Sequence, residues 1–332
     1  MTIIPEPLKA GDSVAILAPS WSMNVVGEDI LKNIENYFWS FGVNVVYWKA
    51  CRKDFFWSGW TPKERADDMM EAFKNPRIKA IIPIFWWFTA NQVLPYLDFD
   101  YIQAHPKFLM WYSDITALDI AILSKTWITT LLWPGGTQLW HYFPDKYTLG
   151  SFEDMMMLGK KEISIWASKI WTQWARRLDS NHDTREKINN DWWLVVNAWE
   201  ASWISFWWNI STLALLLGSE YIKIPKNSIL FLEECWDLTE GRIIRYLEQF
   251  NQVWLFTTAK AVIFGRFEKS SKLRFDYLSE VMKNYIGDDI PLVLNTDFWH
   301  TEPMMTIPLW IKTTINTREQ KISFSITDSE WE

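Results

Sequence analysis

The sequence has few of the residues that mark several special classes of protein. Its 332 residues include two cysteines, Cys51 and Cys235, whose separation fits neither a metal-ligand spacing nor a disulfide framework, so we expect a reduced protein. No apolar run approaches the roughly 20 residues needed to cross a bilayer, which argues against a membrane protein. The net charge is −7, and no basic stretch alternates with aromatic residues, which argues against a nucleic-acid partner.

Targeting signals and cofactor motifs are missing as well. The first residues, MTIIPEPLKAGD, lack a basic segment followed by an apolar run, so we expect no signal peptide and a cytoplasmic location. The sequence contains no H-E-x-x-H, C-x-x-C, Walker loop or G-x-G-x-x-G. We therefore expect no metal and no other cofactor.

Glycine is scarce and tryptophan is abundant. There are 12 Gly and 25 Trp, whereas average usage would give roughly 23 glycines in this length. Tryptophan also stands where a turn or a close backbone approach favours a residue without Cβ: Trp86-Trp87 after an apolar strand, Trp207-Trp208 before a helix, and Trp299 before His300. We hypothesise that many of these positions are glycine in the native protein, through a genetic code that reads UGA as glycine. The alternative is a Trp-rich binding surface, but the tryptophans are scattered along the whole chain.

The gene itself tests this hypothesis. We expect UGA codons at Trp86, Trp87, Trp111 and Trp299, and sequencing of the gene reads them directly. UGG at these positions would exclude the recoding explanation.

The first half of the chain alternates strand and helix patterns. Short apolar runs predict strands, 3.6-residue periodicity predicts helices, and Thr61-Pro62-Lys63-Glu64 has the form of a capping box. This alternation predicts a mainly parallel sheet with helices on both faces, whose ligands bind beyond the carboxyl ends of the strands. The expected strands are 12–19, 43–48, 78–85, 107–111 and 127–133, and the expected helices are 27–40, 62–74, 89–97 and 114–125.

The second half predicts a smaller mixed α/β domain. We expect an N-terminal domain over 1–160, a polar linker or lid over 161–192, and a C-terminal domain over 193–332. The expected strands of that last domain are 193–197, 202–206, 228–233, 260–265, 291–294 and 321–326, and the expected helices are 209–217, 240–250 and 273–284.

Three positions have residue types that suit nucleophilic catalysis. Ser113 lies at a predicted turn from strand to helix, where backbone N–H groups favour developing negative charge, although it or Asp114 could equally cap the helix. Glu233 and Glu234 end a predicted strand, where a carboxylate serves either a site or a solvated end. Among the four histidines, His300 alone follows an apolar strand at a probable sheet edge, as a general base would, although a lone histidine is more often structural.

The chain resembles the LD-carboxypeptidases and their microcin C immunity relatives along nearly its full length. Five segments carry the resemblance in order, and they match a family pattern of Gly-Gly turns, Gly-x-Ser-Asp, Gly-Gly-Asn, Leu-Phe-Leu-Glu-Asp and Gly-His-x-x-Pro. These segments are LKAGDSVAILAPS, IIPIFWWFTANQVLPYLDFDYIQAHPKFLMWYSDITALDIAI, ISFWWNISTLALLLGSEY, SILFLEEC and FWHTEPMMTIPLW. The departures fall at family glycines, which supports the glycine hypothesis; they are Trp86, Trp87, Trp111, Trp207, Trp208, Trp299 and Trp310.

The resemblance implies a flavodoxin-like N-terminal domain and a homodimer. It also implies that Ser113 is the nucleophile, Glu233 the orienting acid and His300 the base, which agrees with the need of a serine for an adjacent, oriented base. The implied oxyanion hole consists of the backbone N–H groups of Asp114 and Trp87. The implied substrate-binding residues are Trp86, Trp111 and Asn209.

The resemblance leaves three functions open. The first is a serine carboxypeptidase that cleaves the amide between an L-centre and a terminal D-amino acid in murein peptides. The second is a microcin-immunity hydrolase of a peptidyl-nucleotide, toward which the Trp-rich segment 163–193 points because tryptophan stacks on nucleobases. The third is a catalytically dead binding protein, since a literal Trp87 would crowd the oxyanion pocket.

Overall fold

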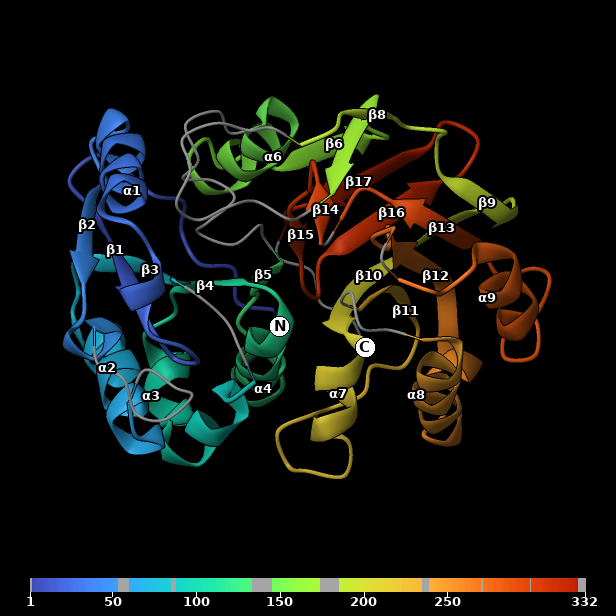
Figure 1. Cartoon of the computed structure of the whole chain (residues 1–332). Coiled ribbons are helices and arrows are strands. Elements are labelled where there is room, and N and C mark those ends of the chain that lie inside the picture. The colour runs from blue at the N-terminus through green and yellow to red at the C-terminus, as the bar shows by residue number, and fades with distance from the viewer. Residues whose placement is uncertain are drawn as a thin grey trace.

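The computed structural model describes residues 2–52, 60–84, 88–132, 145–173, 185–234, 239–269, 271–298 and 300–327. Figure 1 shows two lobes side by side, the first in blue to teal and the second mainly in yellow to red. A six-stranded sheet forms the centre of the first lobe and an eight-stranded sheet the centre of the second, and a small three-stranded sheet accompanies them.

The first sheet has the strand order β15-β5-β4-β3-β1-β2. Five of its strands are parallel, and β15 joins the edge in the antiparallel sense, which confirms the expected parallel sheet. The strands are β1 (Ser13–Leu17), β2 (Asn44–Tyr47), β3 (Ile78–Pro83), β4 (Phe108–Trp111), β5 (Leu131–Leu132) and β15 (Ile307–Pro308). The α-helices are α1 (Glu28–Ser40), α2 (Pro62–Lys74), α3 (Phe99–Ala104) and α4 (Thr116–Thr126), and 3-10 turns are η1 (Met23–Val25), η2 (Lys49–Arg52), η3 (Ala90–Tyr96) and η4 (Ser113–Ile115).

Local sequence explains why these elements form where they do. All five residues of β1 are buried, as expected for a strand covered on both sides. Helix α2 begins with the predicted capping box, in which the Thr61 side chain accepts from the Glu64 N–H and the Glu64 carboxylate accepts from the Thr61 N–H. The segment expected to be one helix over 89–97 is the 3-10 turn η3, which contains Pro95.

The second sheet has the order β6-β17-β16-β10-β11-β12-β13-β9. Its central strands β10 to β13 are parallel, and its flanking strands are antiparallel. It has more strands than the first sheet, although we expected the smaller domain here. The strands are β6 (Glu162–Trp166), β9 (Leu194–Asn197), β10 (Glu200–Asn209), β11 (Ser228–Glu233), β12 (Ala259–Gly265), β13 (Leu292–Thr296), β16 (Lys312–Asn316) and β17 (Lys321–Ser325), and the helices are α6 (Lys146–Met156), α7 (Ile210–Leu216), α8 (Glu240–Gln252), η5 (Phe256–Thr258) and α9 (Phe275–Met282).

The segment 161–192, expected to be a linker, contributes strands to two sheets. Strand β6 forms an edge of the second sheet, while β7 (Ile170–Gln173) pairs with β8 (Ile188–Asn189) and with β14 (Thr301–Glu302). Strands β7 and β8 are short, so their partners rather than their own pattern decide that they form. Strand β6 has the alternating sequence EISIW, with Ile163 and Ile165 buried. Strand β15 comes from the second half of the chain but pairs with β5 of the first sheet. A single boundary along the sequence therefore does not separate the two sheets. The domain boundaries stay a prediction.

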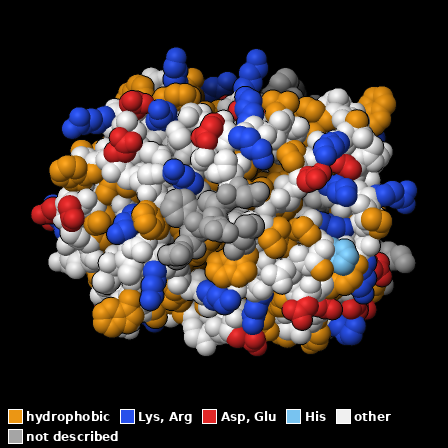
Figure 2. All heavy atoms as spheres, turned by 180° about the vertical axis from the view of Figure 1, so that it is seen from behind, with side chains coloured by type: hydrophobic (Ala, Val, Ile, Leu, Met, Phe, Trp, Pro, Cys, Tyr) orange, Lys and Arg blue, Asp and Glu red, His pale blue; other side chains and the backbone are white. Residues whose placement is uncertain are grey.

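None of the helices in the described part combines the length and the apolar character that a membrane span requires. On the face of the molecule shown in Figure 2, basic and acidic side chains are interspersed, with apolar ones between them.

Four tryptophans adopt a backbone conformation that favours glycine. Among the described residues, Trp127, Trp192, Trp254 and Trp310 have φ values of 62°, 71°, 66° and 59°. A bulky side chain in this left-handed region costs roughly 1–2 kcal/mol, because its Cβ crowds the following carbonyl oxygen. Trp310 is one of the family-glycine positions singled out from the sequence, and the other three extend the set.

Two helix ends show tryptophan and glycine in the same structural place. Gly42 follows α1 and Trp254 follows α8. In each case the N–H of this residue bonds to the carbonyl three residues earlier (2.8 and 3.0 Å), and the next N–H bonds to the carbonyl five residues earlier (3.0 and 3.1 Å). These two hydrogen bonds define the Schellman motif, whose left-handed position is usually glycine. The shared geometry supports the glycine hypothesis.

The pair Trp207-Trp208 behaves differently from the expected turn. Both residues lie inside β10, paired with β11, and both are completely buried. Their indole N–H groups have no hydrogen-bond acceptor among the described residues, which is unfavourable for a buried donor. The turn expected here was therefore wrong, because the strand continues to Asn209.

Replacing Trp254 by glycine tests the cost of the left-handed tryptophan. We expect Trp254→Gly to raise the free energy of unfolding by about 1 kcal/mol, because glycine adopts positive φ without strain. The matched control is Trp39→Gly, since Trp39 is also near a helix end and is 76% exposed, against 72% for Trp254, but is helical. There we expect a loss of up to about 1 kcal/mol. Urea denaturation measures both; equal losses would contradict the strain argument.

Candidate active site

The candidate residues lie where the carboxyl ends of strands from both sheets meet. Ser113 follows β4 of the first sheet, and Glu233 ends β11 of the second. Two contacts join these ends: the rings of Tyr112 and His300 lie edge to face with centroids 5.8 Å apart, and the Asn209 N–H donates to Thr116 Oγ1 over 3.4 Å. Open α/β sheets bind ligands at this edge.

Ser113 stands at a strained turn between β4 and η4, which leads directly into α4. Its φ is 60°, in the left-handed region, while Tyr112 before it is extended. For a residue other than glycine, this conformation is unfavourable and persists only where the surrounding structure enforces it. The turn places the serine at the start of a helical segment, where backbone N–H groups favour an oxyanion. The alternative that Asp114 caps the helix is not supported, because its carboxylate accepts hydrogen bonds from Ser20 and Ala90 instead.

Asp114 connects the serine turn to the first lobe. Its buried carboxylate accepts from Ser20 Oγ over 2.6 Å and from the Ala90 N–H over 2.7 Å. Burial raises its pKa, while these hydrogen bonds oppose the rise. Through Ala90, Asp114 fastens the chain that follows β3 to the residue after Ser113. Ser20 was not predicted from the sequence as a site residue. The signal that could have indicated it is its position at the end of the motif LKAGDSVAILAPS, which contains β1.

Glu233 and His300 lie together, and both side chains are almost completely buried. The Nδ1 of His300 is 3.5 Å from Oε2 of Glu233, and the two side chains are 3% and 2% exposed. The distance exceeds that of a good hydrogen bond, but catalytic contacts are often long in an empty site and shorten around substrate. A carboxylate at Nδ1 selects the tautomer whose Nε2 accepts a proton, as a general base requires.

Burial shifts the pKa values of this pair in opposite directions. It lowers the pKa of His300 to about 3, because the imidazolium loses its hydration. It raises the pKa of Glu233 well above its ordinary value, and the charge of Glu234 adds to the rise. Both effects favour uncharged groups in the empty site. A charged transition state would therefore need the carboxylate and the imidazolium together.

The structure distinguishes the two adjacent glutamates. Glu234 accepts from the Ser211 N–H over 2.7 Å and from Asn209 Nδ2 over 3.2 Å, so it holds the start of α7, whereas Glu233 faces His300. The Asn209 side-chain oxygen caps the same helix by accepting from the Thr212 N–H. This shows a structural use for Asn209; its expected substrate contact stays a prediction.

Three expected site positions, Trp86, Trp87 and Trp111, and the family-glycine position Trp299 lie wholly or partly outside the description. Trp86, Trp87 and Trp299 are outside the described residues, and Trp111 is described only as the last residue of β4. Among the described residues, no group of three His, Cys, Asp or Glu side chains is arranged to hold a metal ion.

Two family models match the chain. The LD-carboxypeptidase N-terminal domain matches residues 14–132, and the LD-carboxypeptidase C-terminal domain matches residues 209–315. The chain belongs to the LD-carboxypeptidase family. Within that family, it is 28% identical to a putative carboxypeptidase of Treponema pallidum, over 97% of this chain and 95% of the relative. It is 26% identical to the microcin self-immunity protein MccF of Escherichia coli, over 97% and 96% of the two chains.

Solved structures of family members share the whole fold. An MccF-like protein from Bacillus anthracis superposes with a TM-score of 0.89 at 28% identity, covering 97% of this chain and 99% of that one. The complex of MccF with glutamyl sulfamoyl guanosine gives 0.89 at 25% identity, covering 98% and 99%. The coverage confirms the mixed α/β fold, and the relatives support a hydrolase.

The lowered pKa of His300 predicts a specific dependence of stability on pH. The unfolded chain takes up a proton on this histidine below about pH 6.5, whereas the folded chain does so only near pH 3. Stability is therefore lost as the pH falls through this window, by up to about 1.4 kcal/mol per pH unit. We expect His300→Gln, which removes this penalty, to gain stability relative to the parent as the pH falls from 7 to 5. Urea denaturation at each pH measures the difference.

The control for this measurement is His105→Gln at an exposed position. A difference between His300→Gln and the parent that stays constant from pH 7 to 5, or shrinks, would contradict the buried neutral imidazole.

Proposed function

We propose that this chain is a serine-type LD-carboxypeptidase, which cleaves the amide between an L-centre and a terminal D-amino acid of a murein peptide. The observation that carries the proposal is the buried contact of Glu233 with His300, next to the strained turn that presents Ser113. A carboxylate, an imidazole and a serine in this relation form the arrangement that activates a hydroxyl for acyl transfer.

In the proposed mechanism, His300 removes the proton of the Ser113 hydroxyl while the oxygen attacks the amide carbonyl. Glu233 holds the imidazole and stabilises the imidazolium that forms. The backbone N–H groups of Asp114 and Trp87 would stabilise the oxyanion, each by roughly 3–4 kcal/mol. The tetrahedral intermediate then collapses, the C–N bond breaks, and His300 gives its proton to the leaving D-amino acid. Water, deprotonated by His300, next hydrolyses the acyl-enzyme and restores Ser113.

The second candidate is the hydrolysis of an aminoacyl-nucleotide antibiotic. It is supported by the relatives, since MccF structures contain glutamyl sulfamoyl guanosine and aspartyl sulfamoyl adenosine. The tryptophans expected to stack a nucleobase support it less. Trp193 is buried and donates its indole N–H to Asp297, and Trp171 lies under the Arg266 guanidinium, 5.1 Å from its centre.

The third candidate, a binding protein without activity, conflicts with the retained Ser113, Glu233 and His300 in adjoining positions. A small peptide or peptidyl-nucleotide is the partner common to all three candidates. The expected homodimer and cytoplasmic location stay predictions.

The decisive assay measures the release of D-alanine from an L,D-linked murein tetrapeptide. We expect release by the parent chain and a loss of about 10³-fold or more in Ser113→Ala, because the nucleophile is removed. The melting temperature of the variant controls for folding. Release that persists in Ser113→Ala would contradict the proposed nucleophile.

Parallel incubation with an aminoacyl sulfamoyl adenosine tests the second candidate. Cleavage of this compound without D-alanine release would favour the nucleotide hydrolase. If neither substrate is cleaved, the variant with glycine at positions 86, 87, 111 and 299 distinguishes a blocked site from a binding protein. Activity in that variant alone would show that tryptophan blocks the site.

A further inference from the structure

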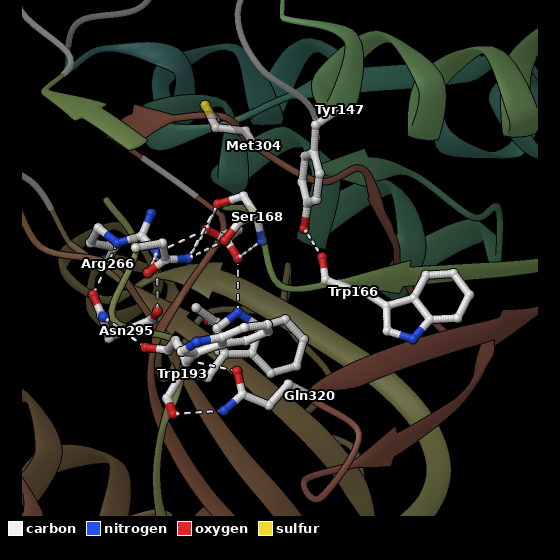
Figure 3. Close-up of polar contacts among 12 residues, drawn as sticks. Tyr147, Trp166, Ser168, Trp193, Arg266, Asn295, Met304 and Gln320 are labelled. Atoms are coloured by element: carbon white, nitrogen blue, oxygen red, sulfur yellow. Dashed lines mark hydrogen bonds and ion pairs between the residues drawn. The ribbon is translucent and has the colours of Figure 1, made fainter. Parts of the chain in front are cut away.

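Asp297 is a fully buried carboxylate three residues before His300, and donors surround it. Its Oδ1 accepts from Ser168 Oγ (2.5 Å), Arg266 Nη2 (2.8 Å) and Asn190 Nδ2 (3.3 Å). Its Oδ2 accepts from the Ser168 N–H (2.9 Å) and from the indole N–H of Trp193 (2.8 Å). Figure 3 shows Ser168, Arg266 and Trp193 close together, from different segments of the chain.

The donors come from segments far apart in the sequence. Ser168 lies between β6 and β7, Asn190 follows β8, Trp193 precedes β9, and Arg266 follows β12. Asp297 thereby attaches residues 161–193, which are the predicted linker 161–192 together with Trp193, to the loop that carries His300. Trp193 is held a second time, since its backbone N–H donates to Gln320 over 3.0 Å.

The positive charge beside Asp297 is equally enclosed. Arg266 is 2% exposed, and its Nε and Nη2 donate to the Asn295 side chain (3.0 Å) and to Asn190 Oδ1 (3.0 Å). The guanidinium also lies over the Trp171 ring. A buried ion pair is tolerable only when further hydrogen bonds saturate it, and removing one partner leaves an uncompensated charge. The pair therefore commits both loops to one arrangement.

The backbone at Asp297 and Phe298 is closely packed as well. The Met305 N–H donates to the Asp297 carbonyl over 2.8 Å. Gly265 lies directly beneath the loop, where an added Cβ would meet the Phe298 carbonyl oxygen at 2.6 Å. Asp297 is thus held both through its side chain and through its backbone.

A second attachment lies on the other side of His300. Strand β14, which begins at Thr301, pairs with β7, and Thr301 lies opposite Gln173. Glu302 forms a buried ion pair with Arg185 over 2.7 Å, and Arg185 also donates to the Gln173 carbonyl over 3.0 Å. Segment 161–193 therefore contacts the chain both before and after His300.

We propose that Asp297 is a positioning residue for His300, which it holds against Glu233 by joining the His300 loop to the strands of segment 161–193 through Arg266, Ser168 and Trp193. This role rests on the proposed function, because it assigns His300 as the base. Neither Asp297 nor Arg266 touches the reacting atoms in this role. The segment 161–193 then acts on the site by fixing the base, whatever else it contacts.

Two measurements that require no turnover test this role in Asp297→Asn and Ser168→Ala. The matched control is Ser205→Ala, because Ser205 is another buried serine whose hydroxyl contacts the carbonyls of Pro308 and Ile311 and accepts from the Ile311 N–H. Hydrogen exchange reports loosening of residues 163–173 and 298–305, with β1 as the internal reference. The imidazole nitrogen shifts of ¹⁵N-labelled His300 report its tautomer.

In Asp297→Asn we expect exchange in both segments to accelerate together by about tenfold or more relative to β1, and His300 to lose its single-tautomer pattern. Ser168→Ala should show the same changes more weakly, and Ser205→Ala should show neither. Loosening of one segment alone, or an unchanged tautomer despite loosening, would overturn the positioning role. Covalent labelling of Ser113 by a fluorophosphonate probe tests the proposed function separately, since failure to label leaves both measurements interpretable.

Discussion

The carboxyl group of Glu233 and the imidazole of His300 lie 3.5 Å apart and are almost completely buried. Much of the surrounding structure holds them in this position. Neither group is stable as an ion in that place, so each loses its charge when alone and gains it only against the other. The burial that shifts both pKa values is the same burial that would make the pair effective toward a developing charge. It requires two sheets, from two lobes, whose strand ends meet at Tyr112 and His300.

Holding a histidine in such a place demands rigid attachment. The loop that bears His300 has a φ of 35° at that residue, and its flanks are tied to segment 161–193 at Asp297 and Glu302. On the opposite side, Asp114 ties the Ser113 turn to Ser20 and Ala90. Ser113 thus precedes the buried Asp114, and His300 follows the buried Asp297 by three residues; both carboxylates accept several hydrogen bonds. Strain concentrates at the candidate site because the surroundings there are stiff enough to maintain it.

The tryptophans impose a constraint of a different kind. Left-handed backbone at Trp254 and at Gly42 performs the same task, the end of a helix, yet only glycine performs it without steric cost. The backbone at Trp254 thus adopts a conformation that favours glycine, although the sequence has tryptophan there. The family resemblance predicts the same preference for glycine at Trp87, in the candidate oxyanion hole, so stability and activity both depend on which residue stands at these positions.

The sequence by itself determined the alternation of strands and helices, the capping box at Thr61 and the order of the family motifs, because these depend on local periodicity and on neighbouring residues. Only the tertiary structure decided that β7 is a strand, since this run of four residues is paired with β8 and β14, and only the tertiary structure joined β6 to β17. Local sequence did not separate Glu233 from the adjacent, chemically identical Glu234; the family resemblance pointed to Glu233, and the structure shows that Glu233 contacts His300 whereas Glu234 bonds to Asn209 and Ser211. Asp297 likewise had no local signal, because its partners come from segments up to 129 residues away and meet only when the chain is folded.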